Sequence, residues 1–591
     1  MQKDDLAGKV YDSELLKRMF MYTRPFKKLV GSAVFMIIFA SLLQLIAPYL
    51  TKEAIDIYIN GENLDGLYTI VALYLGVMVL VFFVQYIQTY LTQLLGQKLM
   101  YDLRSEIFGH MQKLSLSFFD KNPVGRLMTR VTSDVESLNQ MFTQGVVSIF
   151  GNVFLLVGII SVMISINLEL ALWTFAVIPI LFVITWIFKR KVRIAFREIR
   201  KWLAQINSYL QENITGMNVV QIFNRQQKNY DAFTDINFQH TKAHVKTVSY
   251  YAIFYPAIEL VSALALAIVL VRGGILKMDQ ITTYGALVAF IQYAQMFFRP
   301  ISELSDKFNV LQGAIAAAER VFGLLDTPPK IKSINQHICH QDVNGEIEFN
   351  DVCFAYNEDN WVLENVNFKI ATGSSVAIVG HTGAGKTSLI NLLGRQYEIQ
   401  KGTISIDNKN IRDFELRHLR KTMAMVLQDV FLFSGSIFDN VSLGNPDISL
   451  DDVVDACKKV NAHFFIEKLP KGYATVLNER GSILSMGQRQ LLSFARALVV
   501  DPQILILDEA TSNIDTETEI LIQQALDYMM KGRTSIIIAH RLSTIKHVDK
   551  IMVFHKGHLK EMGNHNELMN EQGLYHQLYQ LQYKEQEKIE A

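Results

Sequence analysis

The 591-residue sequence predicts a membrane protein of two parts: an all-α transmembrane domain of six spanning helices with long cytoplasmic helical extensions, fused to a C-terminal α/β domain of the P-loop type. Three observations predict this fold class. Long uncharged apolar stretches crowd the first half of the chain. In the second half, short β-rich runs alternate with helical stretches around a glycine-rich loop. The length itself exceeds what one hydrophobic core usually supports, so at least two domains are expected.

The composition excludes several classes of protein. Lysine plus arginine and aspartate plus glutamate both number 57, so the net charge is zero and we expect no nucleic-acid partner. Hydrophobic residues make up 50% and charged residues 19%, with a mean hydropathy of +0.18, which excludes a disordered chain and disfavours an ordinary soluble enzyme. Cys339 lies between His337 and His340, but no fourth ligand follows at zinc-finger spacing, so this stretch indicates a polar linker.

Six apolar stretches have the length of membrane spans, because about 20 apolar residues cross a hydrocarbon core of roughly 30 Å. They occupy residues 29–50, 67–90, 146–166, 170–188, 250–271 and 281–298. Buried core helices are the alternative, which six such stretches in one half of a chain disfavour. The only charged residue within them is Glu259, which either lines a cavity or hydrogen-bonds to a neighbouring helix.

The distribution of lysine and arginine predicts the orientation of the spans. These residues concentrate between spans two and three and between spans four and five, so both segments and both termini are expected on the cytoplasmic side of the inner or cell membrane. A helix from Lys189 to Gly216 would extend about 40 Å beyond the membrane. The N-terminus lacks the features of a cleaved signal peptide. Apolar residues at helical spacing predict an amphipathic surface helix there: Leu15, Leu16, Met19, Phe20 and Tyr22.

Domain boundaries follow from changes in pattern. The transmembrane domain is expected over residues 1–326, including the amphipathic helix. The sequence TPPK begins a polar linker over residues 327–345. The α/β domain is then expected over residues 346–591.

A phosphate-binding loop is predicted at residues 380–387, where GHTGAGKT fits the pattern G-x-x-x-x-G-K-[ST]. An apolar strand precedes it and a helix follows, as a phosphate loop requires. The glycines let backbone N–H groups surround phosphate oxygens, and the helix N-terminus adds positive potential. Lys386 is expected to reach the β- and γ-phosphates, and the Thr387 hydroxyl to bind Mg²⁺.

Two further motifs support nucleotide chemistry. The apolar run ILIL ends in Asp508 and Glu509, so Asp508 is expected to hold Mg²⁺ beside the phosphate loop and Glu509 to face the attacking water. An acidic strand end without function is the alternative, which the phosphate loop disfavours. The sequence LSMGQ, from Leu484 to Gln488, places a serine and a glycine at the start of a helix, which is typical of an anion site.

With these motifs in this order, the sequence resembles the ATP-binding cassette (ABC) family, specifically exporter half-transporters with one membrane domain fused to one nucleotide-binding domain. The resemblance covers nearly the whole chain and includes FFDKNPVGRLMTRVTSDVESL in the membrane half. It implies that Tyr356 stacks on adenine and that Gln428 senses Mg²⁺, water and the membrane domain. It further implies that LSMGQ contacts ATP held by the opposite subunit, that Asp515 belongs to the dimer-interface loop and that His540 is the switch histidine. Stretches 118–132 and 208–223 resemble coupling helices.

Together, motifs and resemblance assign three groups of candidate residues. The catalytic group is Glu509, His540 and Gln428, and the Mg²⁺ group is Thr387, Gln428 and Asp508. The ATP-binding group is Tyr356, Gly380, Thr382, Gly383, Gly385, Lys386, Thr387, Ser388, Ser485, Gly487, Gln488 and Asp515.

The resemblance implies ATP-driven export of amphiphilic small molecules, such as drugs or lipid-like compounds, by alternating access. One cassette and six spans imply that the working unit is a dimer. Two departures from the family pattern are LSMGQ where LSGGQ is usual and SNID where SALD is common. The first favours a non-identical partner half-transporter, because the Met486 side chain would weaken one of the two ATP sites. The alternatives are an ATP-gated channel or regulatory membrane protein on the same fold, and a homodimeric lipid flippase.

Overall fold

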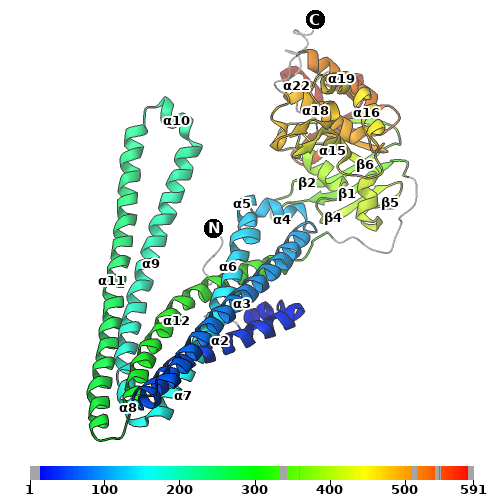
Figure 1. The fold of residues 1–591 in the computed structure, drawn as a ribbon. Coiled ribbons are helices and arrows are strands. Elements are labelled where there is room, and N and C mark those ends of the chain that lie inside the picture. Colours follow the sequence, from blue (N-terminus) through cyan, green and yellow to red (C-terminus); the bar gives the residue numbers. More distant parts are fainter. Residues whose placement is uncertain are drawn as a thin grey trace. The chain divides into compact units, whose positions relative to one another are not determined.

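The computed structural model describes residues 13–331, 343–357, 360–508, 516–539, 545 and 547–582 (Figure 1). The chain divides into two compact units. The first comprises Met1–Gln112 and Gly125–Thr327, and the second comprises Lys113–Val124 and Pro328–Ala591. Most of the expected linker lies outside the described residues, so the domain boundaries stay predictions.

The first unit is built from helices throughout its described part. They are α1 (Ser13–Met21), α2 (Lys27–Glu53), α3 (Leu64–Met111), α5 (Val124–Thr129), α6 (Val135–Gln140), α7 (Val147–Ile166), α8 (Leu168–Phe175), α9 (Ile178–Thr215), α10 (Met217–Ile222), α11 (Gln226–Met278) and α12 (Tyr284–Leu325). Asn63, Asn167 and Thr283 begin α3, α8 and α12, because each side chain accepts a hydrogen bond from an otherwise unpaired backbone N–H. The helix α1 confirms that the segment around Leu15 is helical.

Five helical segments of the described chain are long and apolar enough to cross a membrane: Arg24–Ile59, Leu64–Met111, Val124–Ile166, Leu168–Thr215 and Gln226–Met278. A sixth apolar stretch, Tyr284–Phe298, is shorter and forms the beginning of the 42-residue helix α12. These segments contain five of the six predicted spans in full and the sixth from Tyr284 onward. The first unit is therefore a multi-pass membrane domain.

The helices α9 and α11 continue far past their apolar parts. The predicted helix beyond Lys189 is confirmed, because α9 runs without a break to Thr215. It packs along α11, and the short helix α10 joins the two (Figure 1). Phe188 of α9 stacks on Phe254 of α11 with ring centroids 3.7 Å apart.

A buried carboxylate ties α12 to the short π-helical turn Arg130–Asp134. Asp134 is 6% exposed and accepts hydrogen bonds from Arg130 Nη1 at 2.9 Å and from Arg320 Nε at 3.1 Å. Removing one partner of a buried ion pair leaves the other charges uncompensated.

Replacing Asp134 with asparagine is therefore expected to lower the free energy of unfolding by about 3 kcal/mol. Thermal unfolding of the purified protein in detergent measures this. The control is Glu198→Gln, which removes the half-exposed ion pair between Glu198 and Lys246, 3.1 Å apart, and should change stability by less than about 1 kcal/mol. Equal shifts in Tm for the two variants would contradict a special role for Asp134.

The second unit contains twelve strands in its described part. They are β1 (Ile347–Phe354), β2 (Leu363–Ile370), β3 (Ser375–Val379), β4 (Lys401–Ile406), β5 (Lys409–Asn410), β6 (Met423–Val426), β7 (Gly435–Ser436), β8 (Val476–Leu477), β9 (Ile504–Asp508), β10 (Thr534–Ile538), β11 (Lys550–His555) and β12 (His558–Gly563). The main sheet has the order β12-β11-β3-β10-β9-β6, in which only β12 is antiparallel to its neighbour. An antiparallel sheet has the order β2-β1-β4-β5, and β7 pairs with β8. The predicted α/β class is confirmed.

In the part of the second unit that the structure describes, the α-helices are α4 (Leu116–Lys121), α13 (Lys386–Leu393), α14 (Leu416–Lys421), α15 (Ile437–Ser442), α16 (Leu450–Lys459), α17 (His463–Glu467), α18 (Met486–Leu498), α19 (Thr516–Met530), α21 (His565–Glu571) and α22 (Leu574–Gln582). The main sheet is buried on both faces. Alternate residues of β3 point to opposite faces, so Ala377 joins one apolar core with α16 and α18, and Ile378 joins a second core with α13 and the antiparallel sheet. Coverage of both faces explains why the inner strands β3 and β9 each contain four consecutive apolar residues.

Candidate functional site

The candidate site lies where several parallel strands of the main sheet end. Asp508 of β9 is level with Ile538 of β10, which is level with Ile378 of β3. On the other side of β9, Leu507 is level with Val426, the last residue of β6. The phosphate loop after β3, Asp508 and Gln428 therefore meet at one edge of the sheet, the edge where ligands bind in open parallel sheets.

The phosphate loop connects β3 to α13 and depends on glycine at two close approaches. Gly380 has φ +151°, and a Cβ there would lie 2.2 Å from the carbonyl oxygen of Phe554. Gly385 has φ +97° and begins α13, and a Cβ there would lie 2.7 Å from Leu363 Cδ2. Only glycine fits both positions, so the loop can bring its backbone N–H groups together at the start of the helix.

The side chain of Lys386 folds over and hydrogen-bonds to this loop. Its Nζ donates hydrogen bonds to the carbonyl oxygens of Gly380 at 2.5 Å and His381 at 3.2 Å, and the residue is only 8% exposed. Burial lowers the pKa of Lys386, while the nearby Asp508 carboxylate opposes that shift. The ammonium group is thus placed within the loop, where it can meet the phosphates of a nucleotide.

Asp508 and Thr387 lie together and fit a magnesium site. Asp508 is 5% exposed at the end of β9. Burial raises its pKa, whereas the Lys386 ammonium and a hydrogen bond from the Thr387 hydroxyl lower it, and Asp429 raises it further. A carboxylate and a hydroxyl beside a phosphate loop are the oxygen ligands that Mg²⁺ takes together with phosphate. When bound, Mg²⁺ would neutralise charge on the phosphates.

Other predicted ATP-binding residues in and near the phosphate loop lie at the surface of the same site. Thr382, Gly383 and Gln428 are exposed. Tyr356 is 41% exposed, and its hydroxyl shares a hydrogen bond of 3.0 Å with the Ser388 hydroxyl on α13. This bond places an open aromatic ring beside the phosphate loop. Tyr356, Ser388, Lys386, Thr387 and Asp508 are therefore brought together by the fold.

The signature segment has a structural role of its own. Ser485 caps α18, and its hydroxyl accepts a hydrogen bond from the Gln488 N–H at 3.2 Å. The Gln488 side chain accepts one in return from the Ser485 N–H at 3.0 Å. Both side chains are thus used to begin the helix, while Gly487 is buried and Met486 is 46% exposed. This segment begins α18, whereas the phosphate loop begins α13. Its Ser485 and Gln488 side chains each bond to the backbone N–H of the other residue.

Three predicted residues, Glu509, Asp515 and His540, lie outside the described part of the chain. Their roles stay predictions.

Sequence reasoning missed Tyr397 and its partner. The ring of Tyr397 meets that of Tyr356 edge to face with centroids 5.1 Å apart, and its hydroxyl donates a hydrogen bond to Asp120 in α4. Burial raises the pKa of Tyr397, and this hydrogen bond raises it further. Asp120 lies 277 positions before Tyr397, and no local motif marks the pair. The segment that resembles the first coupling helix thereby contacts the neighbour of Tyr356.

Comparison with protein families gives two matches. The family model described as ABC transporter transmembrane region matches residues 30–301, and the one described as ABC transporter matches residues 363–512.

Individual relatives match over nearly the full chain. The uncharacterized ABC transporter ATP-binding protein YknV of Bacillus subtilis is 38% identical over 582 residues, covering 98% of this chain and 96% of its own. The probable multidrug resistance ABC transporter ATP-binding/permease protein YheH of the same organism is 37% identical, covering 91% and 80%. The ATP-dependent lipid A-core flippase of Syntrophus aciditrophicus is 35% identical, covering 97% and 95%.

Proposed function

The chain belongs to the ABC transporter family, as a membrane domain fused to an ATP-binding domain, and from this premise we propose that it exports amphiphilic small molecules as one half of a dimeric exporter. Membership makes the chain an ATPase coupled to transport across a membrane. Export from the cytoplasm, alternating access and the class of substrate are the proposed part. The names of the multidrug and flippase relatives favour drugs or lipid-like amphiphiles as substrates.

One observation carries the proposal: the ends of β3 and β9 bring Lys386, Thr387 and Asp508 together beside the glycine-rich loop, on a chain that also contains the apolar spans, and this arrangement supports binding of ATP and Mg²⁺. In the proposed cycle, two ATP molecules close a pair of nucleotide domains, the long helices α9 and α11 turn the membrane cavity outward, and hydrolysis at Glu509 resets it. The basic segments between the spans support a cytoplasmic position for the ATP-binding domain and both termini.

The partner is proposed to be a different half-transporter. The exposed side chain of Met486 stands at the first position of α18, where a glycine would leave the backbone open to a partner's nucleotide. A homodimer would carry this side chain at both ATP sites, whereas a heterodimer confines it to one. We expect the partner to contain LSGGQ and to lack the equivalent of Glu509. A homodimer that tolerates methionine is the alternative.

The test is transport by proteoliposomes that contain this chain alone or together with its candidate partner. The pair is expected to accumulate an amphiphilic dye against its gradient when ATP is supplied, and the chain alone to show little ATPase activity that the dye stimulates. In the pair, Met486→Gly should change ATP hydrolysis at the site that LSMGQ of this chain completes, which is the slow site because the partner lacks the equivalent of Glu509. Hydrolysis at the other, fast site, which contains Glu509, should stay largely intact.

Each contrary result identifies one alternative. Full dye-stimulated ATPase activity from the chain alone would refute the heterodimer but would remain compatible with export. Dye movement only down its gradient, with ATP opening the path, would favour the ATP-gated channel and refute export.

A further inference from the structure

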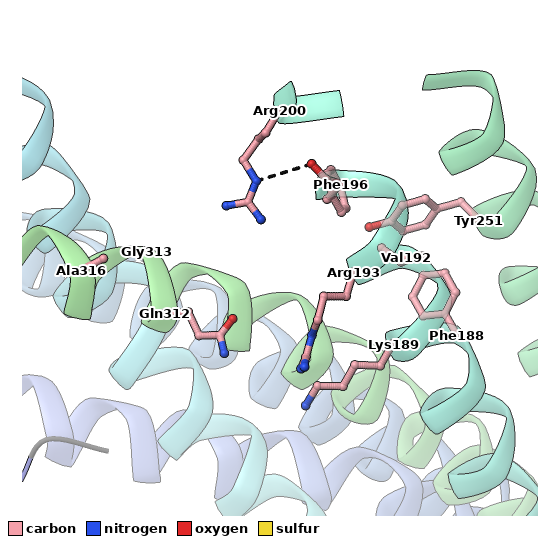
Figure 2. Close-up of a pocket in the computed structure, with 10 residues that line it drawn as sticks. All are labelled: Phe188, Lys189, Val192, Arg193, Phe196, Arg200, Tyr251, Gln312, Gly313 and Ala316. Carbon is pink, nitrogen blue, oxygen red and sulfur yellow. Dashed lines mark hydrogen bonds between the residues drawn. The ribbon is translucent and has the colours of Figure 1, made fainter. Parts of the chain in front are cut away.

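A cavity of about 440 Å³ opens in the first unit between α9, α11 and α12 (Figure 2). The helix α9 contributes most of its walls, Tyr251 contributes from α11, and Gln312 and Gly313 contribute from α12. Figure 2 shows that the side chains of Lys189 and Arg193 leave α9 on the side that faces Gln312. The proposed export function assigns no role to this cavity.

The cavity is lined by cations. Lys189, Arg193 and Arg200 all belong to its wall, and among the side chains that the structure describes no acidic one does. Among the residues that the structure describes, no carboxylate lies within 4.0 Å of the guanidinium of Arg193 or Arg200. Arg200 Nε donates only a long hydrogen bond of 3.4 Å to the Phe196 carbonyl oxygen. The positive charge of these guanidinium groups is thus available to an anionic ligand.

Apolar rings lie next to these charges. Phe188 and Tyr251 meet edge to face with centroids 5.1 Å apart, and Phe196 completes this side. The opposite wall is small, because Gly313 and Ala316 carry little or no side chain, and a Cβ added at Gly313 would meet no atom within 4 Å. The cavity therefore suits a ligand that is anionic at one end and apolar at the other.

The depth of the cavity matches the boundary of a membrane. Lys189 is the first charged residue after the uncharged stretch 170–188. At 1.5 Å per residue, Arg193 lies about 6 Å and Arg200 about 16 Å further along α9. The headgroup layer is roughly 5–7 Å thick on each side of the hydrocarbon core. Lys189 and Arg193 are thus at the level where lipid phosphates lie.

We propose that this cavity binds the phosphate headgroup of an anionic lipid from the cytoplasmic leaflet, with its apolar part against Phe188 and Tyr251. Guanidinium groups match the oxygens of phosphate in geometry and charge. The inference deepens the proposed export function, because it places an anionic amphiphile on the membrane domain of the exporter. Glu259, the one charged residue within the predicted spans, is exposed on α11 and does not line this cavity.

The experiment measures lipid binding to the full chain in detergent by native mass spectrometry, without ATP or a partner. Short-chain phosphatidylglycerol is titrated against phosphatidylcholine of the same chain length. The wild type should bind phosphatidylglycerol preferentially, and Arg193→Gln should weaken that binding roughly 10- to 100-fold, the scale of one lost hydrogen bond to a charged group. Gly313→Leu should block it by filling the cavity.

Matched variants keep the test specific. Arg197→Gln removes a charge from the same helix outside the cavity, and Gly323→Leu adds a side chain to open space elsewhere on α12, so both should bind phosphatidylglycerol as the wild type does. The Tm of every variant verifies folding.

Three outcomes would overturn the proposal. They are equal binding of the two lipids, equal losses in Arg193→Gln and Arg197→Gln, or displacement of phosphatidylglycerol by glycerol 3-phosphate at similar concentration, which would assign the cavity to free phosphate esters. Because binding needs no ATP, a failure of export in proteoliposomes would refute the proposed function and leave this result standing.

Discussion

Replacing Glu509 with glutamine is expected to lower ATP turnover by a factor on the order of 10²–10⁴ while ATP binding survives. Glutamine keeps the shape of the side chain but cannot accept a proton from the attacking water. Glu509 directly follows Asp508, which the structure places beside Thr387 and Lys386 at the end of β9. Single-turnover ATPase assays on the purified exporter measure the loss, and equilibrium binding of ATP shows what is retained.

The matched control is Glu517→Gln, the same chemical change in the exposed first turn of α19. It should leave turnover unchanged. Near-normal turnover of Glu509→Gln, in a preparation whose partner has no hydrolytic site of its own, would remove Glu509 from the role of general base. Loss of ATP binding in the same variant would instead point to a structural effect.

The parts of the fold that could be predicted are those with a local pattern. Each span is uncharged over the width of a bilayer, so its composition alone identifies it. The last four residues of the strand before Gly380, Val376–Val379, are apolar because both faces of the main sheet are covered there, and the glycine spacing that follows is required by the close contacts with Phe554 and Leu363. Sequence therefore located the phosphate loop, and the structure adds why these positions exclude other residues.

The parts that could not be predicted depend on pairs far apart in the chain. Tyr397 is an aromatic residue in an unremarkable stretch, and only the fold places its ring on Tyr356 and its hydroxyl on Asp120. Asp134 likewise belongs to a quoted family segment, but its burial between Arg130 and Arg320 has no sequence signal. The Ser485 and Gln488 capping box has a local signal, a serine followed three residues later by glutamine, which was interpreted only as an anion site.

Replacing Lys386 with alanine is expected to raise the Kd for ATP on the order of 100-fold, in contrast to the Glu509 variant. The structure supports a binding role, because the Lys386 ammonium is buried within the loop that faces the phosphates and already donates to two loop carbonyl groups. A group so placed can transfer its hydrogen bonds to phosphate oxygens without leaving the loop. Titration with a fluorescent ATP analogue measures the change in affinity.

The stability of the domain separates lost binding from lost folding. ATP should raise the Tm of the wild type and of Lys458→Ala, which removes an exposed lysine from α16, but should not raise that of Lys386→Ala at the same concentration. Without ATP, the three proteins should have similar Tm values. The Tm of Lys386→Ala should be slightly lower, because the carbonyl groups of Gly380 and His381 lose their hydrogen-bond donor. If Lys386→Ala bound ATP normally and lost only turnover, the lysine would act on the transition state alone, since an interaction made only there lowers kcat without changing the affinity for substrate.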